Sequence, residues 1–154
     1  MLVGHYLATY AGGDAIAQLI RGIMKKALFA ALLGLVSGGC ATAPTVAEFE
    51  SAYFGEYPGD YEGMIKGYMA QRLKDPESAR YQFLNAPRKA WNGFGGRKYG
   101  WAVCATINGK NSYGGYVGNR PSYFLLRDGL VVDSMHGDGQ YGDAMVQGLC
   151  KPFV

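Results

Sequence analysis

The sequence predicts an α+β fold, in which an N-terminal helix packs on a small antiparallel sheet of three to five strands and a short C-terminal helix completes the domain. Three patterns indicate this fold: a stripe of large side chains at helical spacing, an aromatic-rich stretch that alternates with a period of two, and an Asp-Gly pair between two apolar runs. Many of the 24 glycines lie in the second half, which also favours turn-rich β structure.

The N-terminal helix is expected from Asp60 to about Leu73, with Asp60 as its N-cap. Asp75-Pro76 ends it, because the residue before a proline disfavours the α conformation. We interpret its stripe as core packing rather than as a ligand site. The residues of the stripe follow the i, i+3, i+4 spacing and are Tyr61, Met64, Ile65, Tyr68 and Arg72.

The strands are expected in the second half of the chain. Asp128-Gly129 is the strongest signal for a two-residue hairpin turn, and the odd-numbered positions from Tyr99 to Ile107 alternate with smaller or polar residues. The expected elements are four strands, over residues 79–84, 99–107, 122–127 and 130–135, and a short helix over residues 141–149.

Residues 24–39 have the three parts of an export signal. Two lysines follow Met24, ten apolar residues follow the lysines, and Ser-Gly-Gly precedes Cys40. Ten helical residues span only about 15 Å, which is too short to cross a hydrocarbon core of ~30 Å. The apolar stretch also lacks the polar face that a core helix usually has.

The sequence Ser37-Gly38-Gly39-Cys40 resembles the lipobox of bacterial lipoproteins, although Ser37 stands where Leu is usual. The resemblance implies a lipid on Cys40, cleavage before it and further acylation of the new amino terminus. Ala41 follows the cysteine, and a residue other than Asp there implies sorting to the periplasmic face of the outer membrane. Two or more acyl chains give stable anchoring to a membrane.

These features divide the chain into four parts. We expect residues 1–23 to be a mistaken N-terminal extension, with Met24 as the true start, and residues 24–39 to be the signal peptide. Residues 40–58 are expected to form a tether, part of which docks on the domain, and residues 59–154 a single α+β domain.

Two segments of the domain resemble an uncharacterised family of bacterial exported proteins and lipoproteins. Residues 74–79 (Lys-Asp-Pro-Glu-Ser-Ala) match a KDPxSA segment, and residues 104–118 match a CxxxNxKNxxGGYxG segment. The resemblance covers roughly residues 65–150 and departs from the family at Ala105-Thr106-Ile107, where Gly-Glu-Val is usual. It implies a class of protein and no activity.

The stretch from Asn108 to Asn119 is expected to form a loop between strands, either a well-packed turn or a binding loop. A lysine and two tyrosines there could present a cation and aromatic faces to a sugar or a protein partner. Glycine pairs permit positive φ, and asparagine amides can bond turn backbone. The candidate binding residues are Asn108, Lys110, Asn111, Tyr113, Gly114, Gly115 and Tyr116.

Cys104 and Cys150 form an even pair once Cys40 carries a lipid, and we predict a disulfide between them in an oxidising compartment. Two buried free thiols are the alternative. A bridge closing a loop of this length corresponds to roughly 4 kcal/mol in the chain-entropy model.

His136 is the histidine of the expected domain. Beside Asp138 and Asp143 it could act as a general base or join a metal site, but the spacing matches no standard metal motif and a glycine-rich turn explains it as well. A Cys104–His136 nucleophile pair is conceivable unless Cys104 is bridged. The chain has no Gly-x-Ser-x-Gly, His-Glu-x-x-His or phosphate-loop motif.

The charge of the expected mature protein is nearly neutral. Arg21, Lys25 and Lys26 precede Cys40, as does Asp14, so 12 of the 15 cationic and 11 of the 12 acidic residues remain. This balance gives no argument for nucleic acid binding.

We therefore expect a membrane-anchored envelope lipoprotein with a non-catalytic binding or structural domain, without cofactor or metal, whose partner is an envelope protein or a cell-wall component. One alternative is a periplasmic inhibitor of a cell-wall hydrolase, similar to the small disulfide-bonded lipoproteins that block lysozyme. The other is a small envelope enzyme that uses His136.

Overall fold

The computed structural model describes residues 42–93 and 95–154. The chain divides into two units, Met1–Gly39 and Cys40–Val154, and the described residues belong to the second. The predicted start at Met24, the predicted signal peptide and Cys40, the predicted site of the lipid, lie outside the described residues.

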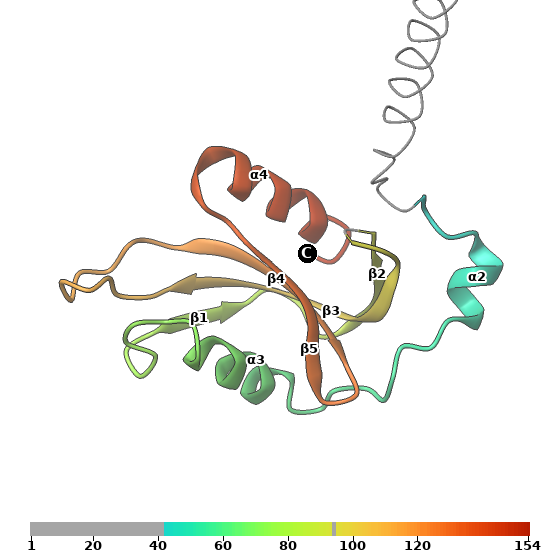
Figure 1. Cartoon of the computed structure of the whole chain (residues 1–154), viewed down its shortest axis with the longest axis horizontal. Helices are drawn as coiled ribbons and strands as arrows, with labels where there is room; N and C mark the ends of the chain where they lie inside the picture. Colours follow the sequence, from blue (N-terminus) through green and yellow to red (C-terminus); the bar gives the residue numbers. More distant parts are fainter. Residues whose placement is uncertain (1–41, 94) are drawn as a thin grey trace, which may run out of the picture. The chain divides into compact units, whose positions relative to one another are not determined.

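A five-stranded antiparallel sheet makes up most of the domain (Figure 1). The longest strand, β3, pairs with β4 along one edge and with both β1 and β2 along the other, and β4 then pairs with β5. The strands are β1 (Arg80–Phe83), β2 (Arg88–Asn92), β3 (Lys98–Asn108), β4 (Arg120–Arg127) and β5 (Leu130–His136).

Three short helices accompany the sheet: α2 (Val46–Ser51), α3 (Tyr61–Ala70) and α4 (Gly139–Cys150). Helices α3 and α4 lie on opposite faces of the sheet in Figure 1. Ile65 and Met69 of α3 join one core cluster, and Val146 and Cys150 of α4 join the other. Among the described helices, none combines the length and the apolar character needed to cross a bilayer.

Alternate residues of the two central strands build these two clusters. The cluster on the α3 face contains Val103, Ala105, Ile107, Phe124 and Leu126. The cluster on the α4 face contains Ala102, Cys104, Tyr123 and Leu125. Strands β3 and β4 are therefore buried on both faces, which is unusual for a small antiparallel sheet.

The predicted architecture, a helix packed on a small sheet, is wrong. The five strands dominate the molecule, and helices of 6, 10 and 12 residues are minor additions to it. The reason lies in β3, whose 11 residues pair with three strands and supply both clusters. Its second apolar face consists of small residues such as Ala102 and Cys104, which the alternation pattern did not distinguish from solvent-facing positions.

Several local predictions are confirmed. Asp128 (φ 52°) and Gly129 (φ 76°) form the turn between β4 and β5. Asp60 caps α3 by accepting a hydrogen bond from the amide of Gly63 at 3.1 Å. The C-terminal helix is also present, as α4.

Two elements, β2 and α2, were not predicted from the sequence. Helix α2 begins with a capping box, in which the Thr45 side chain accepts from the Glu48 amide at 3.2 Å and the Glu48 carboxylate accepts from the Thr45 amide at 2.7 Å. The Thr-x-x-Glu spacing was a readable signal for it. Strand β2 mixes two cationic residues with Ala, Trp and Asn, so its sequence does not alternate in the way that indicates a strand.

Gly100 of β3 is expected to be essential for the close approach of β3 and β4. A Cβ at this buried position would lie 2.5 Å from the carbonyl oxygen of Leu126. We expect Gly100→Ala to lower the free energy of unfolding by about 1–3 kcal/mol, because the paired backbone must shift. The measurement is urea-induced unfolding.

The matched control is Gly67→Ala in the exposed part of α3, where a Cβ would meet nothing within 4 Å. This change should raise the free energy of unfolding by about 0.5–1 kcal/mol, since alanine favours helix. Effects of the same sign at Gly67 and Gly100 would contradict the steric argument.

Candidate functional site

The loop between β3 and β4 is closed by its own asparagines. The Asn111 side-chain oxygen accepts hydrogen bonds from the amides of Tyr113 and Gly115, each at 3.0 Å. The Asn108 side-chain oxygen accepts from the amide of Gly118 at 3.1 Å. Gly114 has a φ of 80°, a left-handed conformation that glycine adopts without cost. Five of the candidate residues thus take part in closing the loop, namely Asn108, Asn111, Tyr113, Gly114 and Gly115.

The segment after α3 holds this loop from one side. Lys110 Nζ lies 3.3 Å from a carboxylate oxygen of Asp75, and the Tyr116 hydroxyl donates to the carbonyl oxygen of Ser78 at 3.0 Å. The guanidinium of Arg80 lies 4.5 Å from the centre of the Tyr116 ring. The two segments that carry the family resemblance therefore contact each other.

The charge of Asp75 is stabilised within this contact. Its pKa is lowered by the hydrogen bond from the Ser78 side chain and, to a smaller extent, by Lys110. Because both side chains of the ion pair are partly exposed to solvent, the pairing orients the loop more than it stabilises the fold.

Among the candidate residues, Tyr113 points its side chain into solvent. Its side chain is 96% exposed, compared with 40% for Tyr116. The predicted cation, Lys110, and one of the two predicted aromatic faces, Tyr116, are engaged within the loop and its support. The loop thus exposes one aromatic ring, that of Tyr113, while hydrogen bonds fix the backbone on which it stands.

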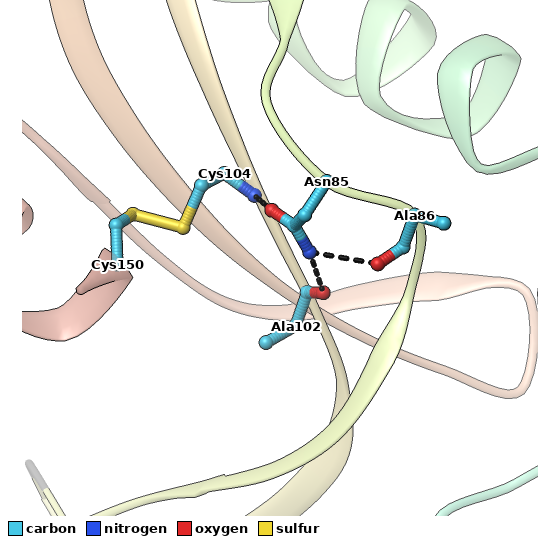
Figure 2. Close-up of a disulfide and its surroundings, with 5 residues drawn as sticks. All are labelled: Asn85, Ala86, Ala102, Cys104 and Cys150. Carbon is cyan, nitrogen blue, oxygen red and sulfur yellow. Dashed lines mark hydrogen bonds between the residues drawn. A yellow bond between two sulfur atoms is a disulfide. The ribbon is translucent and has the colours of Figure 1, made fainter. Parts of the chain in front are cut away.

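Cys104 and Cys150 are joined by a disulfide, as predicted, with their Cα atoms 5.9 Å apart (Figure 2). The bridge ties the end of α4 to the centre of β3, where Cys104 is fully buried. A bridged Cys104 cannot serve as a nucleophile, so the Cys104–His136 pair considered from the sequence is not formed.

Asn85 hydrogen-bonds the backbone of β3 next to the disulfide, on the edge of β3 that pairs with β1 and β2. Its side-chain oxygen accepts from the Cys104 amide at 2.8 Å, and its side-chain nitrogen donates to the carbonyl oxygens of Ala86 and Ala102 at 2.7 and 3.1 Å (Figure 2). One amide side chain thereby takes the place of a strand in the gap between β1 and β2.

His136 lies at the end of β5 on the α3 face, next to the Phe124 ring. Its Nδ1 is 3.1 Å from the hydroxyl of Ser122, whose residue is 2% exposed. Its Nε2 is buried and has no hydrogen-bond partner among the described residues. Burial and, to a smaller extent, the charge of Arg72 lower the pKa of His136.

The residues considered with His136 do not gather into a metal site. Asp138 is bound to Arg120 at 3.0 Å, and its side chain is 95% exposed. In the part of the chain that the structure describes, no group of three His, Cys, Asp or Glu residues could hold a metal ion. The buried Ser122 hydroxyl also offers little access to a substrate.

A groove of about 790 Å³ lies at the other end of the sheet, beside β2. Its apolar walls come from three places: α2, strands β2 and β4, and the segment from the end of α4 onward. They include Val46, Phe49, Trp91, Tyr123, Leu149 and Phe153. The volume is in the range of pockets that bind small molecules. The groove could not be predicted from the sequence, because its walls come from separate parts of the chain.

Helix α2 forms one wall of the groove and is attached to the sheet by few contacts. It has no buried residue. The Phe49 ring packs 5.0 Å from Phe54 and 6.4 Å from Tyr99, and Arg97 binds Glu48 at 3.0 Å. Arg97 also donates to the carbonyl oxygen of Thr42 at 3.0 Å.

Comparisons of the chain with protein-family models, with curated proteins and with solved structures gave no match. The lipobox and the KDPxSA and CxxxNxKNxxGGYxG segments therefore remain sequence-based predictions.

We expect His136 to make stability depend on pH. Unfolded histidine takes up a proton near pH 6.5, whereas folded His136 does so only at lower pH, so the unfolded state binds more protons between these values. The stabilisation is present above pH 6.5 and is lost as the pH falls through the folded pKa. His136→Gln should remove this slope, which is at most about 1.4 kcal/mol per pH unit.

The measurement is the free energy of unfolding of both proteins by urea between about pH 7.5 and about pH 5.5. Carboxylates with lowered pKa, such as Glu48 and Asp75, change the free energy of unfolding only at lower pH. They are also present in both proteins, so they do not affect the comparison. Parallel pH profiles for the two proteins would contradict the role of His136.

Proposed function

We propose that the chain is the precursor of a bacterial envelope lipoprotein, anchored through a lipid on Cys40, whose domain is a non-catalytic module that binds cell-wall material through the loop at residues 108–119. The observation that carries the proposal is the position of the tether and the loop at opposite ends of β3. The export signal and the lipobox resemblance support the anchor.

The chain enters the domain beside the start of β3. Arg97, directly before this strand, donates to the carbonyl oxygen of Thr42 at 3.0 Å and to its hydroxyl oxygen at 3.1 Å. Thr42 is two residues after Cys40. A lipid on Cys40 would therefore place this end of the sheet close to the membrane.

The loop follows the other end of β3 and extends beyond the rest of the sheet in Figure 1. Eleven strand residues span roughly 35 Å at about 3.4 Å per residue. The sheet would thus act as a rigid spacer that holds the loop away from the membrane. Such a position favours contact with a polymer layer over contact with the lipid surface.

The chemistry of the loop fits a glycan that carries carboxylates. Tyr113 offers an aromatic face that is 96% exposed, and aromatic side chains on supported loops are common binding anchors. Beside the loop, the guanidinium of Arg80 lies 4.5 Å from the centre of the Tyr116 ring and has no carboxylate within ion-pair distance among the described residues. Its charge would attract an anionic polymer.

The anchor is tested by the intact mass of the protein recovered, without reduction, from the membrane fraction of its host. We expect the mass of residues 40–154 plus acyl groups, minus two hydrogens for the Cys104–Cys150 bridge. An unprocessed and unacylated mass would refute the anchor and leave the binding module to be judged separately.

The loop is tested by co-sedimentation with isolated peptidoglycan sacculi. Tyr113→Ala should reduce binding about tenfold, as for the loss of an interface anchor, and should change the free energy of unfolding by less than about 0.5 kcal/mol because the ring is exposed. The matched control is Tyr141→Ala, which removes a tyrosine that is 87% exposed on α4.

Undiminished binding of the Tyr113→Ala protein would refute the loop as the binding site. Equal losses for Tyr113→Ala and Tyr141→Ala would refute it too, because they would indicate a general effect of surface tyrosines. Retention of an envelope protein on the loop in place of sacculi would refute the glycan as its partner.

A further inference from the structure

The groove beside β2 has the walls of a site for an apolar chain. Its aromatic and aliphatic side chains come from α2, from β2 and from the residues that follow α4, and Phe49, Trp91 and Phe153 represent these three sides. None of these three side chains is fully buried, so the groove is open to a ligand from solvent or from a membrane.

The start of the described chain also lines the groove. Pro44 and Thr45 are among its lining residues. Pro44 follows Cys40 by four residues, which span at most about 14 Å when fully extended. If Cys40 carries the anchor, Pro44 on the groove wall is therefore held within about this distance of Cys40.

The groove is lined on β2 by one cation, Lys89, which lies 5.0 Å above the Phe54 ring. The Lys89 side chain has no carboxylate within ion-pair distance in the part of the chain that the structure describes. Glu50, on exposed α2, is the carboxylate among the lining residues.

An apolar groove that carries, at the anchored end, a lysine without a carboxylate partner has the complementary chemistry of an anionic amphiphile. We propose that the groove binds an acyl chain of an anionic phospholipid from the anchoring membrane, with Lys89 facing the phosphate. The position of this ligand rests on the proposed anchor at Cys40. Lipid binding would give the domain a second attachment to the membrane beside the anchor, and two attachments would orient the sheet.

The two tryptophans of the chain provide the test, because Trp91 lines the groove and Trp101 does not. Trp101 donates its indole N–H to the carbonyl oxygen of Gly55 at 3.1 Å and packs against Tyr57. The protein, extracted from its host membrane, is placed in detergent micelles that contain phosphatidylglycerol with brominated acyl chains, which quench tryptophan on contact. The Trp101→Phe protein reports on Trp91, and the Trp91→Phe protein reports on Trp101.

We expect the brominated lipid to quench most of the Trp91 fluorescence and little of the Trp101 fluorescence. In the Trp101→Phe protein, the added change Phe153→Asp should abolish this quenching, because it places a charge in the groove. The added control Leu130→Asp, at a 67% exposed position of the β4–β5 hairpin, should leave it unchanged. Lys89→Glu should raise the lipid concentration for half-quenching about tenfold for phosphatidylglycerol and much less for phosphatidylcholine.

Equal quenching of the two tryptophans would overturn the proposal, as would quenching that Phe153→Asp leaves intact. Trp91 fluorescence that brominated lipid does not reach would also overturn it and would favour an extended peptide as the occupant. The intact mass of the same preparation separates this result from the anchor. Acylated protein with unquenched Trp91 refutes the groove alone, and unacylated protein with quenched Trp91 refutes the anchor alone.

Discussion

Strand β3 is buried, so its backbone must be hydrogen-bonded along both edges and its side chains must be packed against other residues on both faces. The rest of the domain depends on this requirement. Its edge toward β4 is paired over seven residues, from Trp101 to Ile107. Its other edge is shared by β1 and β2, and the side chain of Asn85 satisfies the backbone between them. A buried strand with unpaired backbone groups would lose much of its stability. Asn85 therefore allows two short strands, β1 and β2, to pair along one edge of β3 without leaving its backbone between them unbonded.

The same strand determines how the two faces are covered. Residues of β3 with larger side chains pack under α3, and the small residues Ala102 and Cys104 leave room for α4 on the opposite face. The disulfide from Cys104 to Cys150 then holds α4 in that space. Because Phe153 follows the end of α4 by three residues, fixing this end also positions one wall of the groove.

Local signals were sufficient for the parts of the structure that depend on neighbouring residues. The Asp128-Gly129 turn requires positive φ, and Asp60 caps α3 through an amide three residues away. The Cys104–Cys150 bridge was predicted because two cysteines leave one pairing. The candidate loop was also delimited correctly, but its division into a supporting Tyr116 and an outward Tyr113 depends on Ser78 and Arg80, which are distant in sequence.

The sequence alone determined the turn, the cap of α3, most strands and the cysteine pairing, because each follows from the conformational preferences or chemistry of a few residues. Only the tertiary structure decided that the sheet dominates and that β2 joins it. It also decided that residues near positions 45, 90 and 150 enclose a groove. These features arise from contacts between segments that are distant in sequence. Small residues such as Ala102 contribute by leaving space for α4, and a local sequence pattern does not show this effect.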